Sequence, residues 1–118
     1  MSTFQEFPSL VVASCLTGIA LTTMKGFGEV HAVAAQLLGD DIYTHELAYE
    51  PLMEKVTAEG YWQFPLMPTR AEAEADWEAA AAKVTKTYGA TVIVRKGTGG
   101  RREDPVTTLY NMIATRLE

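Results

Sequence analysis

Cysteine is almost absent from this chain, which contains only Cys15 among 118 residues. A lone cysteine cannot form an internal disulfide, so the fold does not depend on an oxidising compartment. Cys15 also lies in an apolar run, where burial keeps a thiol protonated and unreactive. We therefore expect Cys15 to have a packing role, and we expect the protein to be cytoplasmic.

Long apolar runs are absent as well. The run at residues 10–21 is shorter than the ~20 residues that a membrane-spanning helix needs. No Lys or Arg precedes it, and Glu6 lies where a signal peptide would be positively charged. We therefore expect a buried element here and no membrane association.

Basic side chains are few, since ten Lys and Arg stand against fifteen Asp and Glu. A protein that binds duplex nucleic acid normally presents excess basic residues to the phosphates, so direct nucleic-acid binding is not expected. Residues 1–88 contain five basic and twelve acidic side chains, whereas residues 89–118 contain five and three. An acidic body with a basic C-terminal part is a weak indication of a partner protein of mixed charge.

The composition, with 47% hydrophobic and 21% charged residues, is that of a globular protein, and the length fits a single domain over residues 1–118. Helical and strand patterns together predict an α+β fold, with four or five helices packed on a small sheet of two to four strands. A sheet edge could pair with another copy, so a homodimer stays open.

The clearest predicted helix runs from Thr69 to Tyr88. Thr69 and Glu72 form a Thr-x-x-Glu capping box after a proline, and Gly89 follows the last helical residue. Four acidic residues cluster near its start, where negative charge suits the helix dipole. They also form a candidate partner-binding surface: Glu72, Glu74, Asp76 and Glu78.

The β-branched stretch 90–95 predicts an interior strand, whose partner would be residues 42–45, residues 19–22 or another subunit. Asp104-Pro105 then predicts the start of a C-terminal helix that packs on the sheet. Its apolar residues recur at i, i+3, i+4, i+7 and i+11. They are Val106, Leu109, Tyr110, Ile113 and Leu117.

Five weaker patterns complete the secondary-structure prediction. Pro8 predicts the start of a helix that ends near Gly18, with a strand as the alternative because of Val11 and Val12. A stripe from Phe27 to Leu38 predicts a helix that ends at Gly39. Residues 19–23 and 42–47 are expected to be extended. Glu50-Pro51 predicts a short helix that ends at Gly60, before an aromatic loop at 61–65 that suits either an interface or closure of the core.

No catalytic arrangement stands out. His45-Glu46 begins like a zinc-protease motif, but Tyr49 occupies the place of the second histidine. Serine lacks a G-x-S-x-G context, and no carboxylate pair has the spacing of acid and base catalysis. We therefore predict no enzyme, no metal and no cofactor. The segment Tyr43, Thr44, His45 and Glu46 is either a polar site or a hydrogen-bonded brace.

The glycine-rich loop at 96–102 is the best candidate for a small ligand. Backbone N–H groups in such a loop can hold an anion, and Lys96, Arg101 and Arg102 could neutralise it. The loop lacks the G-x-x-x-x-G-K-[ST] spacing of a P-loop. A solvated turn is the competing interpretation, in which Arg101 and Arg102 contact a partner protein.

The segment Leu37-Leu-Gly-Asp-Asp-Ile-Tyr-Thr-His-Glu-Leu-Ala48 resembles a group of small, uncharacterised phage and prophage proteins, as does Leu16-Thr-Gly-Ile-Ala20. That group often has Arg-Pro after Leu-Gly, where this chain has Asp40-Asp41. The resemblance covers about residues 10–50 and implies no assigned activity. A phage setting, together with small size and acidity, would suit a counter-defence protein such as an anti-CRISPR protein.

Two functions follow as hypotheses. The first is a phage-encoded, non-enzymatic inhibitor that binds a host defence complex such as a CRISPR effector in the host cytoplasm, where an acidic face could compete with nucleic acid. The alternative is a small-ligand or nucleotide-binding protein, or a minor enzyme, that uses the loop at 96–102.

Overall fold

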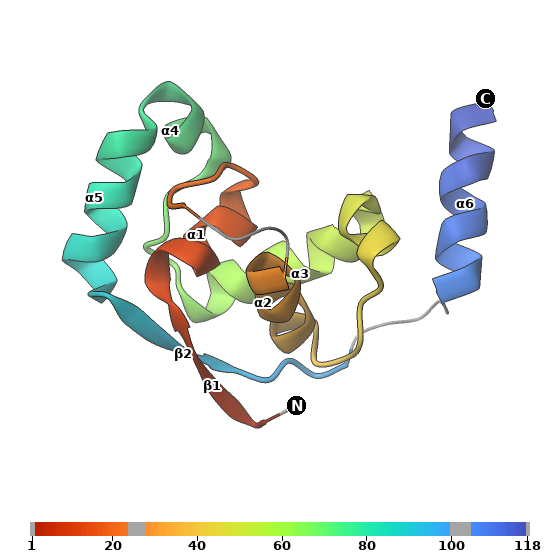
Figure 1. Cartoon of the computed structure of the whole chain (residues 1–118), viewed down its shortest axis with the longest axis horizontal. Helices are drawn as coiled ribbons and strands as arrows, with labels where there is room; N and C mark the ends of the chain where they lie inside the picture. Colours follow the sequence, from red (N-terminus) through yellow and green to blue (C-terminus); the bar gives the residue numbers. More distant parts are fainter. Residues whose placement is uncertain (1, 24–27, 100–104, 118) are drawn as a thin grey trace.

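The computed structural model describes residues 2–23, 28–99 and 105–117. Its elements, in chain order, are β1 (Phe4–Pro8), α1 (Ser9–Thr17), α2 (Gly28–Leu38), the 3-10 helix η1 (Thr44–Ala48), α3 (Glu50–Gln63), α4 (Arg70–Ala75), α5 (Trp77–Tyr88), β2 (Thr91–Arg95) and α6 (Pro105–Leu117). The predicted α+β class is confirmed: the described residues form six α-helices and a two-stranded antiparallel sheet (Figure 1).

The sheet joins the first strand to a strand more than eighty residues later. Phe4 lies opposite Arg95 and Pro8 opposite Thr91. The predicted partners at 42–45 and 19–22 were therefore wrong, and β2 is not an interior strand in the described sheet. Its side chains alternate, with Val92 and Val94 buried and their neighbours exposed, because helices cover one face only.

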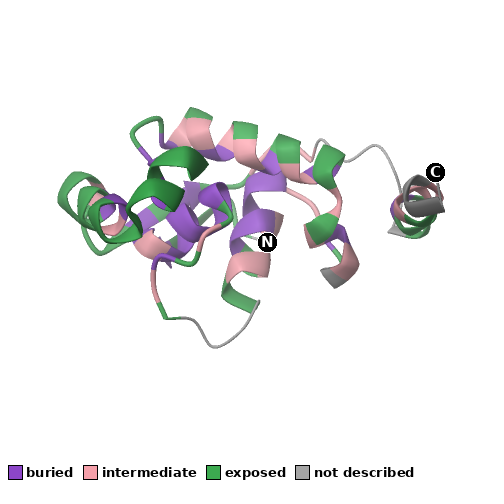
Figure 2. Ribbon diagram, turned by 90° about the horizontal axis from the view of Figure 1, so that it is seen from above, coloured by how far each residue is buried: buried purple, intermediate pink, exposed green. Residues whose placement is uncertain are grey.

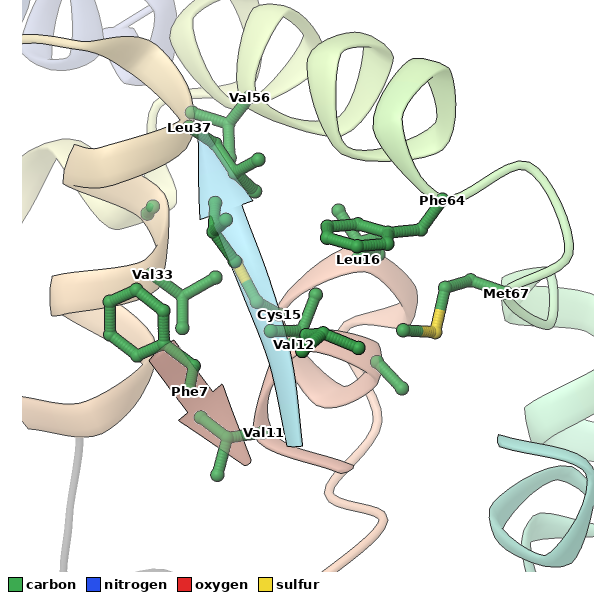
Figure 3. Close-up of a cluster of buried hydrophobic side chains, with 14 of the residues drawn as sticks. Phe7, Val11, Val12, Cys15, Leu16, Val33, Leu37, Val56, Phe64 and Met67 are labelled. Carbon is green, nitrogen blue, oxygen red and sulfur yellow. The ribbon is translucent and has the colours of Figure 1, made fainter. Parts of the chain in front are cut away.

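Helix α1 lies at the centre of the core. Pro8 precedes it, as predicted, and Gly18 ends it in the left-handed region with φ 73°. Every residue from Val11 to Thr17 is buried, because α2, α3 and α5 all pack around this short helix. Figure 3 shows side chains of α1, α2 and α3 directed toward one another, among them Cys15, Leu37 and Val56.

Helix α3 continues past the glycine that was expected to end it. Gly60 is buried inside α3, and a Cβ placed there would lie 2.1 Å from Leu16 Cδ2. The glycine thus allows α3 to approach α1 closely, and the helix ends at Gln63. The expected strand at 19–23 is absent from that described stretch, and η1 replaces the extended segment expected at 42–47.

The single helix predicted from Thr69 to Tyr88 is two helices. Its capping box at Thr69 is confirmed, with the Glu72 N–H donating to Thr69 Oγ1 at 3.2 Å. At Asp76 the backbone is extended, with φ −158° and ψ 92°, and the Asp76 carboxylate accepts from the Ala79 N–H at 3.1 Å. Asp76 is thus an N-cap that starts a second helix, because its side chain competes with the helical backbone.

Helix α6 stands apart from the other elements in both views (Figures 1 and 2). It contacts η1, so the prediction that this helix packs on the sheet was wrong. Among the residues that the structure describes, no helix combines the length and the apolar character that crossing a membrane requires.

Candidate functional site

The 3-10 helix η1 holds a buried carboxylate. Glu46 is 0% exposed. Its Oε1 accepts from the backbone N–H of Tyr43 at 3.0 Å, and its own N–H donates to the Tyr43 carbonyl at 2.9 Å. This reciprocal pair closes the turn, and it leaves Oε2 for a partner from another element.

That partner is Thr108 of α6. The Thr108 hydroxyl, 1% exposed, donates to Glu46 Oε2 at 2.6 Å, and His45 Nε2 lies 3.5 Å from the same hydroxyl. One turn later, Asn111 Nδ2 donates to the Tyr49 hydroxyl at 3.4 Å. These hydrogen bonds, which we call the brace, fasten the C-terminal helix to η1 and Tyr49. The side chain of Thr44 lies outside the described residues.

The apolar stripe of α6 points away from this brace. With 3.6 residues per turn, the stripe is centred roughly 150° around the helix from Thr108. The exposed fractions of its members are 76% for Val106, 43% for Leu109, 70% for Tyr110 and 50% for Ile113. We call these four residues the outward face of α6; the side chain of Leu117 lies outside the described residues. The helix is thus held by its polar side, with its apolar side in solvent.

The acidic residues near α4 and α5 are mostly engaged within the fold. Glu72 bonds Lys83 Nζ at 3.2 Å, and Glu74 bonds Arg70 Nε at 2.8 Å. The hydrogen bond from Lys83, with those from Thr69, lowers the pKa of Glu72 below its usual value. Asp76 caps α5, and Glu78 is the one of the four whose side chain makes no hydrogen bond or ion pair within the described residues.

Because the helix breaks at Asp76, the four carboxylates do not lie along one continuous helix. They lie on two short helices, and three of them stabilise those helices or their junction. This arrangement favours a mainly structural role for the cluster.

The described part of the glycine-rich loop packs against the C-terminal end of α2. The Gly97 N–H donates to the Gln36 carbonyl and the Gly99 N–H to the Leu38 carbonyl, each at 2.9 Å. A Cβ at Gly97 would lie 1.9 Å from the Leu37 carbonyl oxygen, so only glycine fits. These N–H groups satisfy helix carbonyls rather than face an anion. Arg101 and Arg102 lie outside the described residues.

The end of α3 covers the outer edge of β2. The Gln63 amide donates to the Arg95 carbonyl at 2.9 Å and accepts from the Arg95 N–H at 3.0 Å, as a neighbouring strand would. The Arg95 guanidinium lies 4.9 Å from the Trp62 ring centroid and 3.6 Å from Glu59. Phe64 is buried and closes the core, as one of the two suggested roles of the aromatic segment requires, whereas Trp62 is exposed.

A cleft of about 720 Å³ lies between the end of α1, helix α3 and the start of α4. Leu16, Leu47 and Met53 line it, with the carboxylates of Glu50 and Glu54 among its polar groups. Cys15 also lines the cleft, but burial raises the pKa of its thiol to about 12. The thiol therefore has the packing role expected from the sequence. No local sequence pattern indicates the cleft, because residues of α1, η1, α3 and α4 form it together.

The histidine, cysteine and acidic side chains of the described residues do not gather around a common point. No group of three or more His, Cys, Asp or Glu side chains is placed to hold a metal ion within residues 2–23, 28–99 and 105–117. His31, which lies beside α2's apolar side, has Nε2 against the Ile42 carbonyl. This contact ties α2 to the segment that leads into η1.

The comparison with protein families assigns the chain to a family. A family model described as a domain of unknown function (DUF7736) matches residues 7–70, more than half of the chain, and the protein belongs to this family. No curated protein and no solved structure matches. The matched region contains η1 and all residues that line the cleft, whereas α6 lies beyond it.

Proposed function

We propose that this protein acts by binding another protein, without catalysis, through the outward face of α6. The observation that carries the proposal is the orientation of α6. An amphipathic helix of a globular protein normally buries its apolar side against the core. Here the brace from Glu46 to Thr108 holds the opposite side, so four large apolar side chains face solvent.

The mode of binding that fits such a helix is insertion into an apolar groove of the partner, with anchors at i, i+3, i+4 and i+7. Tyr110 would supply the largest anchor, because tyrosine is enriched among the residues that dominate binding energy. The brace supports this mode, since a helix ordered before binding loses less entropy when it binds.

The resemblance to phage proteins supports a target class, a host defence complex such as a CRISPR effector in the host cytoplasm. Among the acidic residues, Glu78 fits contact with such a target best, because the other three have roles within the fold. Small-ligand binding by the loop at 96–102 has less support, because Gly97 and Gly99 donate to α2.

The test is affinity capture from a bacterial lysate that contains CRISPR effector complexes, with bound proteins identified by mass spectrometry. The bait variant carries Tyr110→Ser and Ile113→Ser. The control carries Trp77→Ser and Ile93→Ser, which remove similarly exposed apolar side chains elsewhere. Circular dichroism first establishes that both variants are folded.

We expect the wild-type protein and the control to capture one effector subunit stoichiometrically, and the α6 variant to lose it. Equal capture by all three would contradict a role for α6. If no effector protein is captured, the proposed target class is wrong for that host. Replacing Glu78 by Gln then shows whether the acidic residues contribute to the contact.

A further inference from the structure

The cleft beside α1 and the outward face of α6 are two apolar surfaces that one protomer leaves open. The floor of the cleft includes Leu16 and Met53, and its volume of about 720 Å³ is that of a site which encloses several side chains. The protomer's own α6 does not fill it, because the bond from Thr108 to Glu46 turns the outward face away from the body.

We infer that the cleft receives the outward face of α6 from a second copy of this chain, and that the exchange is reciprocal. The resulting homodimer has two identical contacts related by a two-fold axis, as isologous dimers do. This inference rests on the proposed function insofar as both use the outward face of α6: the dimer covers that face until a partner protein takes it.

The surface area that each arrangement buries favours docking of α6 in the cleft over a direct contact between two α6 helices. Burying the outward face removes roughly 400 Å² from water on the helix, given 150–250 Å² for an aromatic side chain and less for each aliphatic one. A single pair of α6 helices would thus bury roughly 800 Å² in total, the size of a crystal contact. Two contacts between α6 and the cleft bury roughly 1,100 Å², because the open surface of the cleft is smaller than the outward face, and this exceeds the roughly 1,000 Å² that a biological interface needs.

Charge favours the same occupant. Glu50 and Glu54, one turn apart on α3, place two exposed carboxylates at the cleft, and like charges at this spacing repel each other. Arg70 is the one basic residue that lines the cleft, and it pairs with Glu74. The sequence of α6 contains one arginine and no acidic residue. A docked α6 therefore brings no further negative charge to the cleft, and long-range attraction operates between the basic C-terminal part and the acidic body.

The test uses two complementary variants and sedimentation velocity at the highest attainable concentration. The helix variant carries Tyr110→Ser and Ile113→Ser. The cleft variant carries Met53→Lys and Thr57→Lys, which place charges in the apolar cleft. The matched control carries Thr85→Lys and Thr87→Lys on the exposed side of α5.

We expect the wild-type protein and the control to sediment at twice the 12.9 kDa of one chain. Each complementary variant alone should be monomeric, with its dissociation constant raised at least about tenfold, since buried anchor residues dominate such contacts. An equimolar mixture should associate more strongly than either variant alone, because the α6 of the cleft variant and the cleft of the helix variant still make one intact contact.

Three outcomes would overturn the inference: a monomeric wild-type protein, a cleft variant that stays dimeric, or a mixture of folded variants that associates no more strongly than either variant alone. None of these outcomes tests the proposed function, because the capture experiment tests it separately. The cleft variant keeps its outward face and should capture that partner at least as well as the wild type. Loss of capture by that variant, with α6 intact, would instead count against the proposed function.

Discussion

Replacing Thr108 by valine removes one hydroxyl from the junction between α6 and η1 and leaves the shape of the side chain almost unchanged. In the wild-type protein that hydroxyl donates to Glu46 Oε2 at 2.6 Å, and both residues are buried. After the substitution, Glu46 Oε2 remains buried but no longer accepts the hydrogen bond from Thr108. The carboxylate can regain solvent only if α6 moves away.

The size of the effect follows from that bond. A hydrogen bond to a carboxylate contributes about 1.5–3 kcal/mol, and an unsatisfied buried acceptor costs a similar amount. We therefore expect docking of α6 to weaken by about 2 kcal/mol, which corresponds to a roughly 30-fold larger population of the undocked state. The buried core contains none of the apolar side chains of α6 that the structure describes, so the body should remain folded.

Hydrogen exchange read by mass spectrometry measures this directly. Amides of residues 105–117 should exchange roughly 30-fold faster in Thr108→Val, whereas peptides from α1 and α3 should be unchanged. Thr87→Val, on the exposed surface of α5, is the control for the loss of a threonine hydroxyl. Unchanged protection of α6 in Thr108→Val would refute the brace.

Further predictions concern the fold. Gly97→Ala should lower the free energy of unfolding by about 2 kcal/mol or more in urea titrations, because its Cβ would overlap a carbonyl of α2, whereas Gly28→Ala, where nothing lies within 4 Å, should change it little. Asp76→Ala should lower the melting temperature through loss of a cap worth about 1 kcal/mol, and Glu78→Gln should not; equal effects would contradict the assignment of Asp76 as N-cap. Burial raises the pKa of Cys15 from 9.0 to about 12, so the unfolded thiol ionises first and stability should fall between pH 9 and 12, by up to about 1.4 kcal/mol per pH unit. The pH titration of Cys15→Ala should lack this slope, and an identical slope in both proteins would show that the thiol is not the cause.

The sequence predicts most helices correctly because their ends carry specific residues. Gly18, Gly39 and Gly89 each follow a helix, and all three have positive φ. Gly60 looks the same in the sequence but lies inside α3, because contact with Leu16 rather than a turn requires it. A local pattern cannot distinguish these two uses of glycine, since the second depends on a residue more than forty positions away.

The pairing of β1 with β2 and the placement of α6 also depend on contacts that no local pattern contains. The stripe of α6 correctly predicts an amphipathic helix, but it says nothing about which side is held. That depends on Thr108 and Glu46, which are 62 residues apart in the chain. The polar segment 43–46 was noticed in the sequence, and its partner on α6 was not, because a threonine inside a helix carries no signal of its own.

The central claim is that α6 is held by its polar side with its apolar face in solvent. Nuclear Overhauser spectra of the isotopically labelled cleft variant, which the account expects to be monomeric with its α6 unchanged, test it most directly. The account predicts cross-peaks between the Thr108 methyl group and protons of His45 and Glu46, and none between Tyr110 or Ile113 and residues outside α6. Cross-peaks from Tyr110 or Ile113 to the sheet or to the core helices would show that α6 packs on its own body, and would contradict the account.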